Sequence, residues 1–213
     1  MIFSHESESY ASLWAGLDAS KFNGAYYYSR EIVRNIIPNV ETDRNWVTIL
    51  SKGMCFDHSV VFIHNNDHPR LYQWMRDYND LIIVCGVPTT CAKVGHLGKA
   101  VYLPLSVDVA EVEQYRRRKD KGTCYVGRMG KRRGASFEKG TEYVEGLPRE
   151  ELLAELARYR RVYAVGRCAI EARVLGCEIL SYDKRYPDPS VWKVLDNMDA
   201  AKILQGILDE EDM

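Results

Sequence analysis

The sequence lacks several features that would restrict where the protein works. No apolar stretch reaches the about 18 residues that a membrane span needs. The first residues, MIFSHESESY, carry two glutamates and no basic start before an apolar run, so they predict no secretory signal. The six cysteines form no C-x-x-C pair, which argues against zinc and favours scattered reduced thiols. These absences predict a cytoplasmic chain with no membrane span and no metal site.

An excess of charge of one sign is also missing, but the charge is unevenly distributed. Lysine and arginine number 29 and aspartate and glutamate 30, so nothing draws the whole chain toward nucleic acid. Nine basic residues nevertheless lie between Arg116 and Arg133, with Asp120 as the one acid among them. Such a cluster favours a specific anionic ligand over general polyanion binding. Its first part, Arg116–Lys121, fits either the exposed face of a connecting helix or a contact with DNA.

Short apolar runs alternate with amphipathic segments along the whole chain. This alternation is typical of α/β proteins with parallel sheets, and 213 residues suffice for two compact domains. We predict an α/β fold of two small Rossmann-like lobes, residues 1–107 and 108–213. The expected strands are 2–3, 46–50, 59–64, 81–86, 100–105, 123–127, 141–146, 161–166 and 177–183. Helices are expected between them, including a basic connecting helix over 110–121 and helical stretches over 191–198 and 200–209.

A loop rich in glycine and arginine follows the strand expected at 123–127. Gly127, Gly130 and Gly134 enclose four basic residues: Arg128, Lys131, Arg132 and Arg133. Glycines let backbone amides approach a ligand closely, and arginine or lysine supplies charge for a diphosphate. The spacing matches neither the dinucleotide fingerprint nor the P-loop. By itself the loop also fits a solvated turn.

A second segment, V-G-R-C-A-I-E-A-R-V-L-G-C-E-I-L, begins at Val165. A strand ends at Gly166, and the helix that follows places its first amides where open α/β sheets bind ligands. Glu171 lies about one turn into that helix, among small apolar residues. Its carboxylate is suited to accept hydrogen bonds from sugar hydroxyls. The alternative is an acid that only complements the helix dipole.

Together the two segments resemble the donor-binding domain of GT-B glycosyltransferases, through Y-V-G-R-x-x-x-x-R-G and G-R-x-x-I-E-A-x-x-L-G-x-x-I-L. The resemblance implies that Arg128 and Lys131 or Arg132 hold the donor diphosphate and that Glu171 binds the ribose. Gly166 and Arg167 would lie at the mouth of the site. The donor would be a UDP- or GDP-sugar bound between two lobes. No metal or other cofactor is implied, because basic side chains can supply the charge and the sequence has no D-x-D motif.

The N-terminal half resembles the same family through F-N-G-A-Y-Y-Y-S-R-E-I-V-R-N-I and V-V-F-I-H. The first segment would place Asn23 and Gly24 on the acceptor side. The second ends in His64, a candidate general base for an inverting reaction. A histidine at a strand end also fits a hydrogen-bonded structural role, and that alternative stays open.

One departure from the family pattern bears on activity. Retaining members carry two glutamates eight positions apart, and here Tyr163 stands eight positions before Glu171. The sequence predicts a metal-independent glycosyltransferase that acts on an unknown acceptor, with a glycan or a nucleic acid as candidates. The alternatives are a nucleotide or nucleotide-sugar binding protein without turnover, and a glycosyltransferase that modifies DNA.

Overall fold

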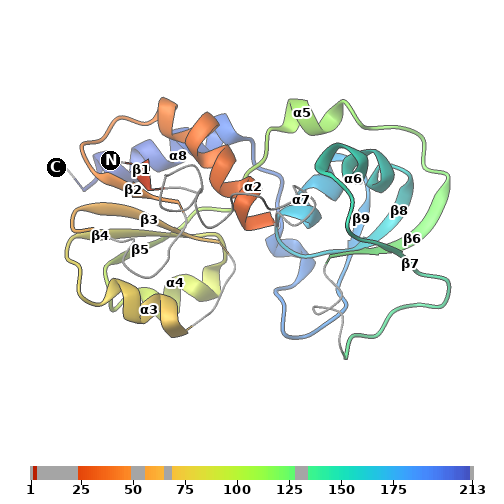
Figure 1. Ribbon diagram of the computed structural model, residues 1–213, viewed down its shortest axis with the longest axis horizontal. Coiled ribbons are helices and arrows are strands. Elements are labelled where there is room, and N and C mark those ends of the chain that lie inside the picture. Colours follow the sequence, from red (N-terminus) through yellow and green to blue (C-terminus); the bar gives the residue numbers. More distant parts are fainter. Residues whose placement is uncertain (1, 4–23, 49–55, 65–68, 128–133, 212–213) are drawn as a thin grey trace. The chain divides into compact units, whose positions relative to one another are not determined.

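The computed structural model describes residues 2–3, 24–48, 56–64, 69–127 and 134–211. The chain divides into two compact α/β units (Figure 1). Unit 1 contains Ile2–Phe3, the residues described between Ala25 and Leu105, and the last helix, α8 (Asn197–Asp209). Unit 2 contains those described between Ser106 and Asp196. Each unit has its own all-parallel sheet, which confirms the predicted pair of Rossmann-like lobes.

The sheet of unit 1 has five parallel strands in the order of the sequence. They are β1 (Ile2–Phe3), β2 (Asn45–Val47), β3 (Ser59–Ile63), β4 (Leu81–Cys85) and β5 (Lys99–Tyr102). Every residue of β3 and β4 is buried, as their continuous apolar runs predict for strands covered on both faces. Strand order never reverses in this sheet.

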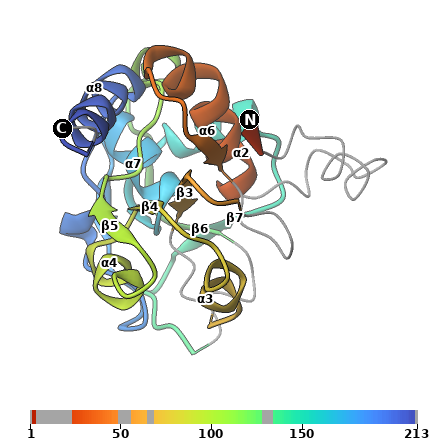
Figure 2. The same ribbon diagram turned by 90° about the vertical axis from the view of Figure 1, so that its left-hand side faces the viewer.

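Helices cover both faces of the unit 1 sheet (Figure 2). On one face lie α3 (Pro69–Met75) and α4 (Pro88–Val94). On the other lie α8 and a helical run made of α2 (Gly24–Glu31), the π-helical η2 (Ile32–Ile36) and the 3₁₀-helical η3 (Ile37–Asn39). Pro38 cannot donate a helical hydrogen bond, so the run tightens and ends there.

Unit 2 has a four-stranded parallel sheet whose order does reverse. Its strands are β6 (Lys121–Val126), β7 (Glu142–Val144), β8 (Tyr159–Tyr163) and β9 (Glu178–Leu180), in the spatial order β7-β6-β8-β9. The chain moves from β6 to one side and then crosses back to β8 on the other. The pair β6–β8 is therefore the topological switch point of the sheet.

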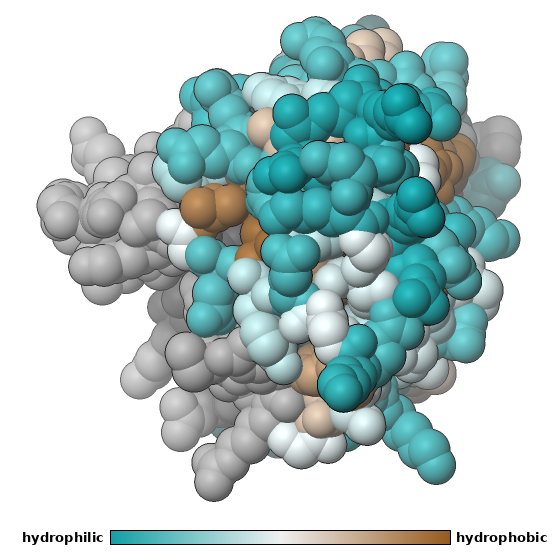
Figure 3. All heavy atoms as spheres, turned by 90° about the vertical axis from the view of Figure 1, so that its right-hand side faces the viewer, coloured by the Kyte–Doolittle hydropathy of each residue, from teal (hydrophilic) through white to brown (hydrophobic). Residues whose placement is uncertain are grey.

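Helices of unit 2 gather on one face of its sheet. They are α5 (Val109–Glu113), α6 (Arg149–Leu156) and α7 (Arg167–Val174), and α7 contacts both of the others. No helix lies between β6 and β7 among the described residues. The outer surface of unit 2 in Figure 3 is mostly hydrophilic, with its apolar area in small separate patches. Two large apolar side chains of unit 2, Tyr143 and Val194, are nevertheless exposed.

Every predicted strand is present within a few residues of its expected limits, but two predicted helices are wrong. The helix expected over 110–121 ends at Glu113. The basic residues after it would place like charges three or four residues apart, which destabilises a helix. Instead, Lys119 donates to the Leu175 carbonyl at 2.7 Å. The stretch 191–198 is not helical as a whole. The 3₁₀ turn η5 (Pro189–Val191) ends at Val191, where the expected stretch begins. Asp196 then forms a parallel bridge with Val107 before α8 begins.

The two units do not divide the chain into halves. Unit 2 begins at Ser106, close to the predicted boundary, but it ends at Asp196. Helix α8 packs against η2 and η3 of unit 1. Asn197 donates to the Glu31 carboxylate, and the Gln205 amide exchanges hydrogen bonds with the backbone of Glu41 at 2.6 and 3.1 Å.

Candidate functional site

The two segments that the sequence singled out in unit 2 follow neighbouring strands. Gly127 comes directly after β6, and Gly166 follows β8 by three residues. These strands are paired in parallel, so their carboxyl ends meet at one edge of the sheet. Open α/β sheets bind ligands at this edge, beside the switch point. Of the two sheets, only that of unit 2 has a reversal of strand order among the described strands, which is the geometry that favours a ligand site.

The turn from β8 to α7 depends on glycine. Gly166 has φ 65° and ψ −141°, a conformation that is essentially restricted to glycine. Its carbonyl accepts from the amides of Ala169 and Ile170 at 3.0 and 3.3 Å, which starts α7. The helix consequently begins at the carboxyl edge of the sheet with Arg167 as its first residue. Amides at such a helix start favour a negatively charged group.

Glu171 lies one turn into α7 and is 2% exposed. Its Oε1 accepts from Nε of Arg167 at 2.7 Å and from Nη1 of Arg149. Its other oxygen, Oε2, accepts no hydrogen bond from any residue in the described part of the chain. The carboxylate is therefore oriented by two guanidinium groups and keeps one acceptor atom for a further donor.

Arg149 is a member of this site that the sequence analysis missed. It is the first residue of α6, and its Nη2 also donates to Oε2 of Glu111 on α5 at 3.2 Å. Burial disfavours its charge, but Glu171 and Glu111 more than compensate, so the pKa of Arg149 is raised. In sequence Arg149 looks like an ordinary helix-start residue among acids, and only the packing of α6 on α7 brings it to Glu171.

The glycine loop is described at its two ends. Gly127 has φ 144°, and a Cβ there would lie 2.9 Å from Oη of Tyr125. Glycine is therefore required by local packing as well as being suited to a ligand. The predicted diphosphate ligands Arg128, Lys131 and Arg132 lie outside the described residues, so their role stays a prediction.

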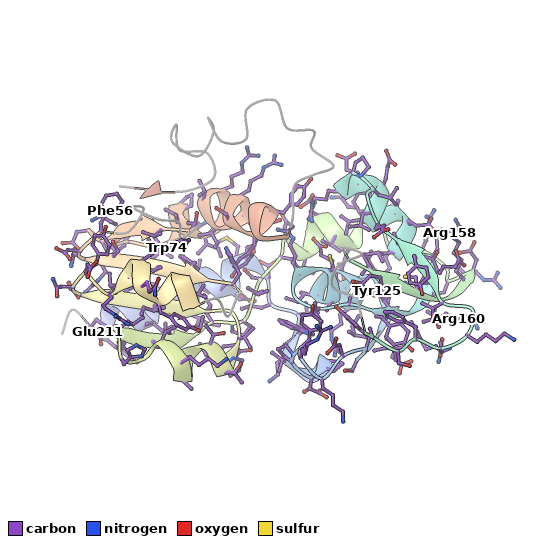
Figure 4. All side chains as sticks on the ribbon, turned by 60° about the horizontal axis from the view of Figure 1, so that its bottom comes forward. Phe56, Trp74, Tyr125, Arg158, Arg160 and Glu211 are labelled. Carbon is purple, nitrogen blue, oxygen red and sulfur yellow. The ribbon has the colours of Figure 1, made fainter. Side chains whose placement is uncertain are left out.

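The face of the unit 2 sheet opposite its helices is covered by aromatic side chains. Tyr125, in the interior of unit 2 (Figure 4), packs against Phe137 and Tyr182 at ring distances of 5.2 Å. Phe137 also lies 5.1 Å from Tyr163. Glu138, next to Phe137, fixes this part of the chain to the sheet, because its carboxylate accepts hydrogen bonds from Thr123 and from Arg161, the latter at 2.7 Å. This aromatic cluster takes the place of a helix.

Tyr163 belongs to this aromatic cluster. It is 8% exposed, and its hydroxyl accepts from the Glu138 amide at 3.4 Å. Where the resemblance would have a second glutamate, the structure has a ring that packs in the interior of unit 2. No carboxylate is supplied from this position.

The basic residues between 116 and 133 are described only in part. Arg116–Lys121 precede or begin β6, whose last residue is Val126, and the basic residues 128–133 lie outside the described residues. At the amino edge, acids pair with several cations: Lys121 contacts Glu155 at 2.7 Å, and Arg158 contacts Asp120 at 3.0 Å. Arg158 and Arg160 point outward from unit 2 (Figure 4). The first part of the cluster therefore lies at the amino edge of the unit 2 sheet, where acids balance part of its charge.

In unit 1, His64 follows β3 directly. Its Nε2 lies 3.1 Å from the Thr48 carbonyl, which can only accept, so Nε2 carries the proton and Nδ1 keeps a lone pair. Nδ1 is buried and has no hydrogen-bond partner among the described residues. The Tyr28 ring contacts the imidazole edge-on at 4.8 Å. Burial lowers the pKa of His64 to about 4, so the ring is neutral at pH 7.

The remaining predicted positions are less informative. Gly24 is the first residue of α2, and Asn23 lies outside the described residues. Five cysteines lie among the described residues, and none of these five forms a disulfide. Across the described ranges, no helix is long and apolar enough to cross a membrane. In the same part of the chain, no three His, Cys, Asp or Glu side chains are grouped so as to hold a metal ion.

Comparison with protein-family models and with curated protein sequences finds no match for this chain. A functional proposal therefore rests on the sequence motifs and on the geometry of the switch point.

Proposed function

We propose that the protein is a glycosyltransferase that takes a sugar from a nucleotide-diphospho-sugar and transfers it to an acceptor. The observation that carries the proposal is the position of two segments at the carboxyl ends of β6 and β8. Gly127 of the first segment directly follows β6, and Gly166 of the second follows β8 by three residues, beside the switch point of the unit 2 sheet. They are the segments that resemble the donor domain of GT-B glycosyltransferases.

In this proposal the protein binds the donor at two places, the ribose and the diphosphate of its nucleoside diphosphate. Oε2 of Glu171 accepts from the ribose hydroxyls, and the start of α7 faces the diphosphate. Arg128 with Lys131 or Arg132 neutralises the charge that grows on the leaving diphosphate, which is the main electrostatic task in such a transfer. His64, in unit 1, stays the candidate general base that the sequence predicts, with a neutral ring and a lone pair on Nδ1. The candidate acceptors are a glycan and a nucleic acid.

A second candidate function is nucleotide-sugar binding without turnover. Two observations make it the second candidate. Tyr163 packs in the aromatic cluster where a second carboxylate would stand, and a histidine whose pKa is about 4 is a weak general base at pH 7. A protein of this kind would bind the donor and leave it unchanged. Transfer to DNA is less favoured, because Lys119 and Lys121 of the basic cluster are already bonded within unit 2.

The test is a thermal-shift screen of the full chain against UDP-, GDP-, ADP- and TDP-sugars, followed by assays for donor consumption. We expect one nucleotide class to raise the melting temperature, and Arg128→Ala and Glu171→Gln to remove most of that rise. The exposed Glu178, on β9 of the same unit, provides the control Glu178→Gln, which should respond as the wild type does. A flat response to all four donors would refute the proposal. Stabilisation by a donor that is never consumed, with glycans or with DNA as acceptor, would establish the binding-only function.

A further inference from the structure

The strongest unexplained feature of the described residues is the ionic group around Glu171. Three charged side chains from the starts of two helices meet there. Side chains of Arg167 and Glu171 are 4% and 3% exposed, and that of Arg149 is 13% exposed. The opposite edge of the sheet has ion pairs of a different kind: Arg158 and Asp120 there are 34% and 58% exposed.

A purely structural role accounts poorly for this group. Taking ions out of water is costly, and apolar residues of the same volume often hold two helices together as well or better. Arg149 and Arg167 are also the first residues of α6 and α7, where the helix dipole disfavours a positive charge. These charges are buried beside a switch point despite the cost of desolvation and the unfavourable helix dipole. Such a pattern is expected of a functional site.

The contacts of Arg149 fix the direction of the Glu171 carboxylate. Both guanidinium groups bind the same oxygen, Oε1, and Arg149 is tied in turn to Glu111 on α5 at 3.2 Å. A carboxylate held at one oxygen cannot rotate freely about its last bond. Its Oε2 is thereby kept in one place, and the described residues supply it with no donor. A ligand donor that meets Oε2 finds it already oriented, which lowers the entropy lost on binding.

We propose that Arg149 is a positioning residue, which holds Glu171 so that its Oε2 recognises ribose hydroxyls of a nucleoside diphosphate. This inference rests on the proposed function and adds to it a residue on another helix, with α5 as support. Arg149 acts through Glu171 and does not bind the diphosphate. Specificity for ribose over deoxyribose is consequently set by the contact between α6 and α7.

The test compares ribose and deoxyribose ligands on the full chain by calorimetry. The probes are UDP and GDP, their 2′-deoxy counterparts dUDP and dGDP, and inorganic pyrophosphate. For the wild type we expect the ribonucleotide to bind about 10-fold more tightly than its deoxy form, as loss of a hydrogen bond to a charged group predicts. In Arg149→Gln the two forms should bind within about 2-fold of each other, because Glu171 is no longer held. Pyrophosphate should bind both proteins equally.

Two further variants separate positioning from folding. Glu111→Gln weakens the support of Arg149 without removing a buried charge, and it should lower the ribose preference part of the way. Arg149→Lys keeps one charged donor and should retain more of the preference than Arg149→Gln. Melting temperatures of all variants show whether a loss of binding merely reports unfolding.

The outcomes distinguish the two proposals. If the wild type binds neither UDP nor GDP, the proposed function fails and the role of Arg149 fails with it. If the wild type binds a nucleotide and Arg149→Gln keeps the full preference for ribose, only the positioning role is refuted. If pyrophosphate binding falls together with nucleotide binding in Arg149→Gln, then Arg149 contacts the phosphates directly, and the positioning role is likewise wrong.

Discussion

His64 makes the stability of unit 1 depend on pH in a predictable direction. Burial lowers its pKa from an ordinary value of 6.5 to about 4 in the folded protein. Between these values the unfolded chain binds a proton that the folded chain does not, so lowering the pH favours unfolding. The stability that the neutral ring provides is present above pH 6.5 and is lost as the pH falls toward 4. From pH 7 to pH 5 the loss amounts to about 2 kcal/mol.

The matched variant is His64→Gln, whose amide can still donate to the Thr48 carbonyl but does not titrate. Hydrogen exchange of the β3 backbone amides reports on unit 1 without a contribution from unit 2. We expect the opening free energy of these amides to fall by about 2 kcal/mol more in the wild type than in the variant between pH 7 and pH 5. Equal pH dependence in the two proteins would show that the imidazole is solvated, and would remove the argument that His64 is a buried neutral acceptor.

Three further predictions concern other positions. Asp80 raises the pKa of His58, so their pairing stabilises the fold below pH 6.5 and is lost as the pH rises through the folded pKa. Asp80→Asn should therefore lower the melting temperature more at pH 6 than at pH 9. The corresponding difference in the free energy of unfolding should be under about 1 kcal/mol, because the pair is exposed. Gly166→Ala should destabilise by about 1–3 kcal/mol in urea unfolding, because Gly166 has a positive φ of 65°. Gly206→Ala, in open space on α8, should instead stabilise by about 0.5–1 kcal/mol. Similar effects at the two glycines would contradict the φ argument. Tyr163→Glu should destabilise by more than about 2 kcal/mol and add no donor hydrolysis, while Tyr163→Phe should cost under about 1 kcal/mol. New hydrolysis in Tyr163→Glu would show that this position faces the donor.

The strands were predictable because local signals agree with tertiary burial. Continuous apolar runs such as Leu81–Cys85 are rich in β-branched residues and are bounded by turns. Such a run is sufficient to predict a strand in a sheet that is covered on both faces. The turn at Gly166 was predictable for a similar reason, because a glycine between an apolar strand and an amphipathic helix has few other uses. The order of the unit 2 strands could not be predicted, since several spatial orders suit the same pattern.

The charged residues were harder to interpret than the apolar ones. Sequence spacing alone groups Arg116–Lys121 with the basic residues 128–133, but Lys119 and Lys121 are bonded within unit 2, to the Leu175 carbonyl and to Glu155. Spacing also hides Arg149, which is 22 residues from Glu171 and meets it only through the packing of two helices. The aromatic face was missed for the same reason, because Tyr125, Phe137 and Tyr182 come from separate segments.

The return of the chain to unit 1 through α8 has a consequence for synthesis on the ribosome. Unit 2 is an insertion: it is complete once Asp196 has left the exit tunnel, whereas unit 1 still lacks its last helix. Until α8 arrives, Ile32 and Ile36 on η2 have no cover from that side. The second unit of the sequence can thus finish folding before the first, and a nascent chain stalled before Asn197 would display an apolar face to chaperones.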